Sequence, residues 1–117
     1  MAGWHSVGAE AAWAEGTMRE VEVAGQPVVV ARVEGRFWAV QGRCPHLRVR
    51  LARGTLQGKV ITCPGHGSQF DITTGQNLLW IDSLPGVIKG MARAISKPQK
   101  LTTLPVKVEQ GEVWVQA

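Results

Sequence analysis

Both cysteines of the chain lie in short motifs that also hold a histidine. The first motif is Cys44-Pro45-His46, and the second is Cys63-Pro64-Gly65-His66 after sixteen intervening residues (47–62). Thiolate sulfur and imidazole nitrogen are ligands that suit zinc, copper or iron. Each motif follows an expected strand, and its prolines and glycines predict a loop. Two such loops can close over a metal from opposite sides, so these side chains form a candidate metal site.

The order of the ligands distinguishes between kinds of metal site. A zinc finger typically has two cysteines close together and two histidines further on, whereas each motif here supplies one of each. This interleaving suits two metal ions better than one, with cysteines on one iron and histidines on the other across bridging sulfides. A mononuclear zinc site is the alternative. A catalytic Cys–His pair would leave the second cysteine and the second histidine without a role.

The residues around the four ligands resemble the Rieske [2Fe–2S] family. The resemblance is carried by Cys44-Pro45-His46, Gly54-Thr55-Leu56, the run 60–71 that contains Cys63-Pro64-Gly65-His66, and Thr74-Gly75. It implies one Rieske-type [2Fe–2S] cluster per chain. In such a site Cys44 and Cys63 bind the inner iron. His46 and His66 bind the outer iron, which is the one reduced, and their ring edges form the electron's exit.

The resemblance also implies a set of residues around the cluster, namely Pro45, Leu47, Pro64, Gly65, Gly67, Ser68 and Phe70. The two glycines let the backbone come close, so that amide N–H groups can point at sulfur. The two prolines stiffen the loops. The hydroxyl of Ser68 is a candidate donor to a bridging sulfide, and a simple loop cap is its alternative role.

Two departures from the quinol-oxidising members of the family bear on the reduction potential. Those members carry an extra cysteine in each loop and a Gly-Ser-x-Tyr run, whereas this chain has no third cysteine and reads Gly67-Ser68-Gln69-Phe70. Phe70 has no hydroxyl, so one of two donors to the cluster remains. Since donors stabilise the reduced cluster, we expect a potential between those of oxygenase-type ferredoxins and the quinol-oxidising class.

The segment that follows the first histidine is unusually basic. Leu47, Val49 and Leu51 nearly alternate with Arg48, Arg50 and Arg53. We expect the apolar residues to cover the cluster and the arginines to ring the exposed histidines. Such a ring would favour docking to an acidic face of a partner; an ordinary solvated loop is the alternative.

The elements that position these motifs are mostly short strands. Alternation or β-branched runs predict strands at 18–23, 28–33, 36–40, 59–62, 69–72, 105–109 and 112–115. Turns are expected at 25–27, at Glu34-Gly35 and at Gln110-Gly111. The piece 8–15 is Ala-rich and predicts one or two helical turns, and helical spacing predicts one short helix near 83–97. The fold expected from the resemblance is all-β, a Rieske-type antiparallel β-sandwich. It forms a single domain (1–117) with a small cluster-binding subdomain at about 43–76.

Composition limits the classes of protein that the chain can represent. It has 117 residues, 44% of them hydrophobic and 19% charged, with a net charge of +4. This length allows one domain, and the composition is that of a globular protein. No run approaches 18 apolar residues, so we expect no transmembrane segment, and no secretory signal is visible. The cytoplasm is therefore the expected location. With no Tyr and only two Phe, the sequence does not favour nucleic-acid binding.

The expected function is one-electron transfer by an electron carrier without catalytic residues of its own. Its implied partners are a reductase that donates the electron and a terminal oxidoreductase, such as an oxygenase, that accepts it. A small electron-transfer subunit of a larger oxidoreductase complex is one alternative, and a zinc-binding structural module is another. A chain of this length has no room for the catalytic domain of a Rieske oxygenase.

Overall fold

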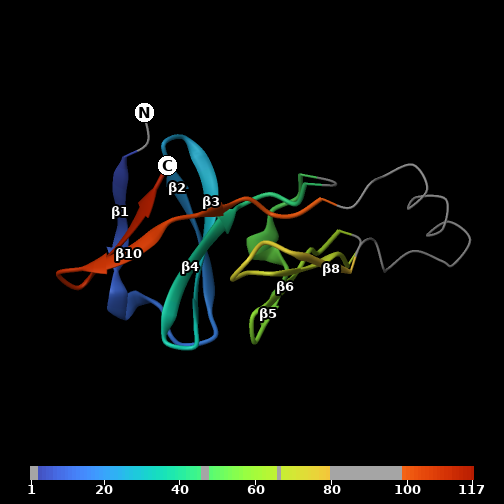
Figure 1. Ribbon diagram of the computed structural model, residues 1–117, viewed down its shortest axis with the longest axis horizontal. Helices are drawn as coiled ribbons and strands as arrows, with labels where there is room; N and C mark the ends of the chain where they lie inside the picture. The colour runs from blue at the N-terminus through green and yellow to red at the C-terminus, as the bar shows by residue number, and fades with distance from the viewer. Residues whose placement is uncertain (1–2, 46–47, 66, 80–98) are drawn as a thin grey trace, which may run out of the picture.

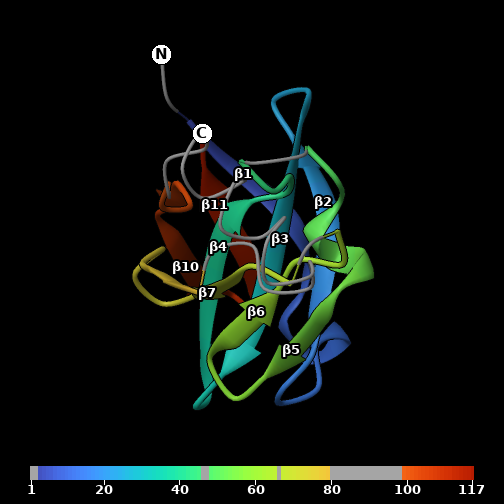
Figure 2. The same cartoon turned by 90° about the vertical axis from the view of Figure 1, so that its right-hand side faces the viewer.

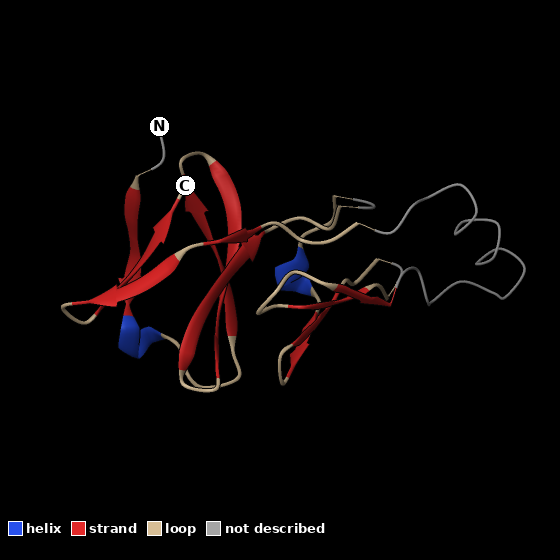
Figure 3. Ribbon diagram, in the orientation of Figure 1, coloured by secondary structure: helices blue, strands red, loops and turns tan. Residues whose placement is uncertain are grey.

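In a computed structural model that describes residues 3–45, 48–65, 67–79 and 99–117, these residues form mostly strands (Figure 3). The strands are β1 (Trp4–Ala9), β2 (Met18–Val23), β3 (Gln26–Val33), β4 (Arg36–Gln41), β5 (Thr55–Gln57), β6 (Val60–Thr62), β7 (Gln69–Asp71), β8 (Asn77–Leu79), β9 (Thr103–Leu104), β10 (Val106–Glu109) and β11 (Glu112–Gln116). Two single-turn 3-10 helices, η1 (Glu10–Ala12) and η2 (Leu51–Arg53), lie among them. The all-β prediction is confirmed, and the helix expected near 83–97 lies outside the described residues.

The strands form three antiparallel sheets. Their orders are β1-β11-β10, β2-β3-β4-β9 and β5-β6-β7-β8. The first two sheets face each other in Figure 1, and the third lies on the far side of the second. The end-on view in Figure 2 shows β5, β6 and β7 in front of β2, β3 and β4, with β1 and β11 behind. The β2-β3-β4-β9 sheet is therefore the middle layer.

Strand β3 explains how one sheet supports two cores. Successive side chains of a strand point to opposite faces. Val28 and Val30 accordingly join the core shared with β11 and Trp13. Val29, Ala31 and Val33 join the second core, which is shared with the third sheet. Because both faces are covered, residues 28–31 of the strand form a continuous apolar run rather than an alternating one.

Three two-residue turns connect the hairpins of the first two sheets. They are Ala24-Gly25, Glu34-Gly35 and Gln110-Gly111, and all six residues have positive φ angles between 51° and 79°. Such angles fit the type I′ turn that matches strand twist. The turns at Glu34 and Gln110 are confirmed. The turn expected at 25–27 is corrected, because the reversal comes at Ala24-Gly25 and Pro27 already lies in β3.

The N-terminal region differs from its prediction in part. The expected helical turn within 8–15 is present as η1, but the preceding strand β1 was not predicted. β1 pairs with β11, and its register shifts between Ser6 and Gly8. Most of its side chains are exposed, so the apolar periodicity that identifies a strand is missing. No helix in the described residues is long and apolar enough to span a membrane.

Candidate functional site

The two cysteines begin two loops with the same backbone hydrogen bonds. We call residues 43–50 loop A and residues 63–68 loop B. In loop A, Arg48 N–H donates to Cys44 O (2.8 Å) and Cys44 N–H donates to Val49 O (2.9 Å). In loop B, the corresponding bonds join Gly67 N–H to Cys63 O (3.2 Å) and Cys63 N–H to Ser68 O (2.8 Å). Each loop is thus closed between its cysteine and the residues four and five positions later.

The residue four positions after each cysteine has a left-handed backbone. The φ angle is 58° at Arg48 in loop A and 75° at Gly67 in loop B. Glycine adopts this conformation readily, whereas a residue with a Cβ does so at a cost of about 1–2 kcal/mol. A proline follows each cysteine directly, and prolines restrict φ and have no N–H to donate. The loops therefore share one backbone design, with an arginine in loop A where loop B has a glycine.

Both thiol side chains belong to the core between the middle sheet and the third sheet. Cys44 is 1% exposed and Cys63 is 2% exposed, and they pack with Leu51, Ile61 and Phe70. Gly65 N–H also donates a hydrogen bond to Cys63 Sγ (3.4 Å). An amide directed at sulfur is what a metal-bound thiolate needs to offset its negative charge. The described residues thus fit a thiolate-bound metal group.

The segment after loop A packs directly against loop B. A Cβ atom added at Gly54 would collide with the carbonyl oxygen of Thr62 and lie 3.1 Å from the ring of Pro64. Leu51 N–H donates to Gly42 O (3.0 Å), and Arg43 and Arg50 form an isolated bridge across loop A. The close approach at Gly54 thus places the segment after loop A against the start of loop B, and the other two contacts close loop A itself.

A buried carboxylate fixes the turn after β7, just beyond loop B. Asp71 accepts hydrogen bonds from the backbone N–H (2.8 Å) and the hydroxyl (2.6 Å) of Thr73, and Lys59 Nζ lies 3.6 Å away. Burial raises the pKa of Asp71, but the hydrogen bonds from Thr73 and the charge of Lys59 outweigh it and leave the pKa below its usual value. The carboxylate therefore stays ionised at neutral pH and has a structural role.

The structure places most of the predicted site residues in the two loops. Ser68 is 1% exposed and Phe70 is fully buried, while Pro45, Pro64 and Gly65 are at the loops' outer surface. His46, Leu47 and His66 lie outside the described residues. Among the described residues no group of three or more His, Cys, Asp or Glu side chains comes together.

The sequence reasoning missed the duplication of the loop backbone. The repeated Cys-Pro start of both motifs was the available signal. The left-handed conformation of Arg48 has no signal of its own, because arginine does not favour it.

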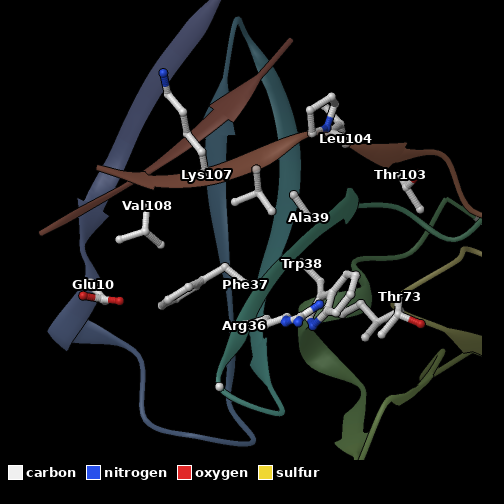
Figure 4. Close-up of a pocket in the computed structure, with 14 residues that line it drawn as sticks. Glu10, Arg36, Phe37, Trp38, Ala39, Thr73, Thr103, Leu104, Lys107 and Val108 are labelled. Atoms are coloured by element: carbon white, nitrogen blue, oxygen red, sulfur yellow. The ribbon is translucent and has the colours of Figure 1, made fainter. Parts of the chain in front are cut away.

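The largest of the described cavities is a separate feature, shown in Figure 4. It has a volume of about 780 Å³ and lies along β4, β9 and β10, where Phe37, Trp38 and Leu104 line it. Among its lining residues in the described part of the chain there is no cysteine or histidine. This cavity is therefore distinct from the cysteine loops.

Comparison with known proteins identifies the family. The family model of the Rieske [2Fe-2S] domain matches residues 3–85. The chain belongs to the Rieske [2Fe-2S] domain family. Its cofactor is accordingly one Rieske-type [2Fe–2S] cluster, in which cysteines ligate one iron and histidines the other.

Full-length relatives of similar size are ferredoxins. The chain is 34% identical to "Ferredoxin CarAc" of Metapseudomonas resinovorans, covering 96% of this chain and 92% of the relative. It is 32% identical to the ferredoxin component of a naphthalene 1,2-dioxygenase system of Pseudomonas aeruginosa, covering 86% and 83%. It is also 32% identical to apoptosis-inducing factor 3 of Homo sapiens, but spans 14% of that protein's length.

Solved structures of Rieske proteins share the fold. A chain in the complex of reduced oxygenase and oxidized ferredoxin of carbazole 1,9a-dioxygenase superposes with a TM-score of 0.75 at 34% identity, covering 96% of this chain and 91% of that chain. The ferredoxin of carbazole 1,9a-dioxygenase from Nocardioides aromaticivorans IC177 gives a TM-score of 0.77 at 21% identity, covering 96% and 95%. The predicted Rieske-type fold is confirmed.

Proposed function

We propose that this protein is a one-electron carrier that receives an electron from a reductase and passes it to a terminal oxygenase. The observation that carries this proposal is the pair of matching loops, each presenting a buried cysteine at the same backbone position. Of the relatives that it spans over most of their length, one is named as a ferredoxin and another as the ferredoxin component of a naphthalene 1,2-dioxygenase system. The bound cluster supplies reversible one-electron chemistry, and the chain acts as a carrier rather than as an enzyme.

We propose that loops A and B together provide the four ligands. Cys44 and Cys63 would hold the inner iron, and their burial excludes water from it. His46 and His66, two and three residues further along, would hold the outer iron. Neutral imidazoles in place of two anionic thiolates raise the reduction potential. A cluster-binding subdomain at about 43–76, within a single domain, is the unit that this assignment implies.

The residues around the ligands would exclude water and tune the cluster. The Gly65 amide would stabilise negative charge on the Cys63 sulfur. Buried Ser68 is the candidate donor to a bridging sulfide, while buried Phe70 supplies apolar surface without a hydroxyl. An electron carrier with reduced thiols at its site fits the cytoplasm, where thiols stay reduced.

Metal analysis, visible absorption and EPR of the purified protein test this assignment. We expect iron and sulfide in equal amounts, a coloured oxidised form and an EPR signal on reduction. His66→Cys replaces a neutral ligand by an anionic one, so a retained cluster should have a lower reduction potential. A colourless protein with one zinc per chain would contradict the proposal. Reconstitution with a ferredoxin reductase and a dioxygenase of the naphthalene type tests the partners.

A subunit of a larger oxidoreductase is the second candidate. It is favoured by the match to apoptosis-inducing factor 3, in which the similar segment is 14% of a longer protein. Affinity purification of the tagged chain from its source cells, followed by mass measurement of the native complex, distinguishes the two. A freely exchanging carrier elutes at the mass of the chain or of a small oligomer, and a fixed subunit elutes with stoichiometric partners.

A further inference from the structure

Four arginines surround the described parts of the cysteine loops. Arg43, Arg48, Arg50 and Arg53 line one groove of about 430 Å³, together with Val49 and with Pro64-Gly65 of loop B. All four are exposed. This groove thus brings positive charge from loop A and η2 to the edge of the Cys63 motif.

A second groove continues the basic surface on the other side of loop A. It has a volume of about 540 Å³, and Arg43 and Arg48 line it as well as the first groove. Its other lining residues include Lys100 and the Cys44-Pro45 pair. We call the five cationic residues of the two grooves the basic collar: Arg43, Arg48, Arg50, Arg53 and Lys100.

Carboxylates do little to neutralise the basic collar. No Asp or Glu is among the described lining residues of either groove. In the described part of the chain, the only ion pair to a collar residue joins Arg50 Nη1 to Glu20 Oε2 at 3.7 Å, and the Arg50 side chain remains 48% exposed. Arg43 donates from Nη1 to the carbonyl oxygen of Arg48 (3.1 Å), which uses one of its five N–H groups.

The backbone at Arg48 gives a second and independent observation. Arg48 has a φ angle of 58°, in the place where loop B has Gly67. A glycine at position 48 would adopt this backbone without the steric cost that a Cβ brings. Strain held at a surface loop is a reason to look for a function of the side chain. Packing does not account for the side chain, because it is exposed at the junction of the two grooves.

We propose that the basic collar docks carboxylate side chains on an acidic surface of an electron-transfer partner. Guanidinium groups bind carboxylates through paired hydrogen bonds, and a concentrated positive field speeds the encounter with an acidic protein. The grooves lie against Cys44 and Gly65, so an acidic surface seated there would lie beside the metal-binding loops. This inference rests on the proposed electron-carrier function.

Small oxidants of opposite charge measure the local field without a natural partner. The reduced protein gives one electron to hexacyanoferrate(III), forming hexacyanoferrate(II), or to tris(1,10-phenanthroline)cobalt(III), forming the cobalt(II) complex. We expect the rate with hexacyanoferrate(III) to fall and the rate with the cobalt complex to rise as salt increases. In the Arg48→Glu/Arg53→Glu variant the hexacyanoferrate(III) rate at low salt should fall roughly tenfold or more.

A matched control separates local from overall charge. Arg36→Glu/Arg19→Glu changes the net charge by the same amount, and both residues are exposed and lie outside the two grooves. Arg36 begins β4, whose length of roughly 17–20 Å separates it from loop A. We expect this control variant to lower the hexacyanoferrate(III) rate at low salt by a factor less than one-third of that for Arg48→Glu/Arg53→Glu. Equal losses in both variants would overturn the proposal, because net charge alone would then explain them.

Binding of an acidic peptide provides a readout without electron transfer. A 15-residue poly-L-glutamate peptide should bind the oxidised protein at low salt in calorimetry, and Arg48→Gly should weaken binding at least threefold without loss of the visible spectrum. Unchanged binding in both Arg48→Gly and Arg48→Glu/Arg53→Glu would overturn the proposal that the basic collar binds carboxylates. Tight binding of duplex DNA in place of the peptide would also overturn it. If no cluster is present, the electron-carrier function itself fails, and the spectrum reports this separately.

Discussion

Loop A and loop B have the same backbone hydrogen bonds but different residues at the left-handed position. Each starts with Cys-Pro, and each closes between its cysteine and the residues four and five positions later. Loop B uses Gly67 for the left-handed position and so has no side chain there, while loop A uses Arg48. Loop B directs a backbone amide at a sulfur, and loop A directs positive charge toward solvent. We propose that the shared backbone sets the geometry of the ligands, and that the difference sets what each loop presents around them.

The largest expected effect comes from removing a feature that the loops share. Cys44→Ser and Cys63→Ser should each abolish cluster incorporation, because an iron that has lost one thiolate is no longer held in a buried site. Iron content and visible absorption of the purified variants measure this. If only one of the two variants lost its iron, the equivalence of the loops would be wrong.

The contact between the loops should be almost as sensitive as their ligands. Gly54→Ala places a Cβ against the Thr62 carbonyl, so we expect a loss of about 3 kcal/mol or more in the free energy of unfolding. Gly58→Ala is the control, because its added Cβ meets nothing within 4 Å and its φ of 59° brings only the left-handed cost, about 1 kcal/mol. Denaturant titration compares them. Equal losses would show that the close approach at Gly54 does not hold the loops together.

The left-handed position should respond in opposite directions in the two loops. Gly67→Ala adds a Cβ at a φ of 75° and should destabilise the protein by about 1 kcal/mol. Arg48→Gly removes one at a φ of 58°, and its gain should be smaller, about 0–1 kcal/mol, because glycine also loosens the unfolded chain. The unfolding free energy is again the measurement. A loss of more than 1 kcal/mol in Arg48→Gly would show that Arg48 is present for stability rather than for its charge.

The smallest expected effect concerns the reduction potential. Ser68 is buried at the end of loop B. The equivalent position of loop A is Val49, which has no hydroxyl group. Loss of a hydroxyl donor to the reduced cluster is worth about 1–1.5 kcal/mol, which is about 40–65 mV for a one-electron couple. Ser68→Ala should therefore lower the midpoint potential in protein-film voltammetry. An unchanged potential would leave Ser68 as a loop cap only.

The sequence predicted those parts of the structure whose local signal and tertiary role agree. This agreement holds for the sequences of β2, β3 and β4 and for the turns at Glu34-Gly35 and Gln110-Gly111. β1 was missed because its side chains are mostly exposed and its strand is imposed by pairing with β11. That dependence on a distant partner is invisible in the local pattern.

The candidate site also has a part that the sequence predicted and a part that it did not. The types and spacing of Cys44 and Cys63 with their neighbouring histidines were enough to predict a metal site, because few other chemistries use those residues together. The backbone of Arg48 was not predictable, since the hydrogen bonds that close loop A between Cys44 and Arg48-Val49 impose it against the preference of the residue. The close approach at Gly54 likewise depends on which strands pack together.

We propose that the two matching loops each give one thiolate and one imidazole to a single cluster. Electron–nuclear double resonance of the reduced protein, prepared with ¹⁵N-labelled histidine, tests this ligand set. We expect two strongly coupled histidine nitrogens in the wild-type protein and one in His66→Cys. A signal with no histidine coupling, or the absence of any signal from a zinc-loaded protein, would show that the ligand set is wrong.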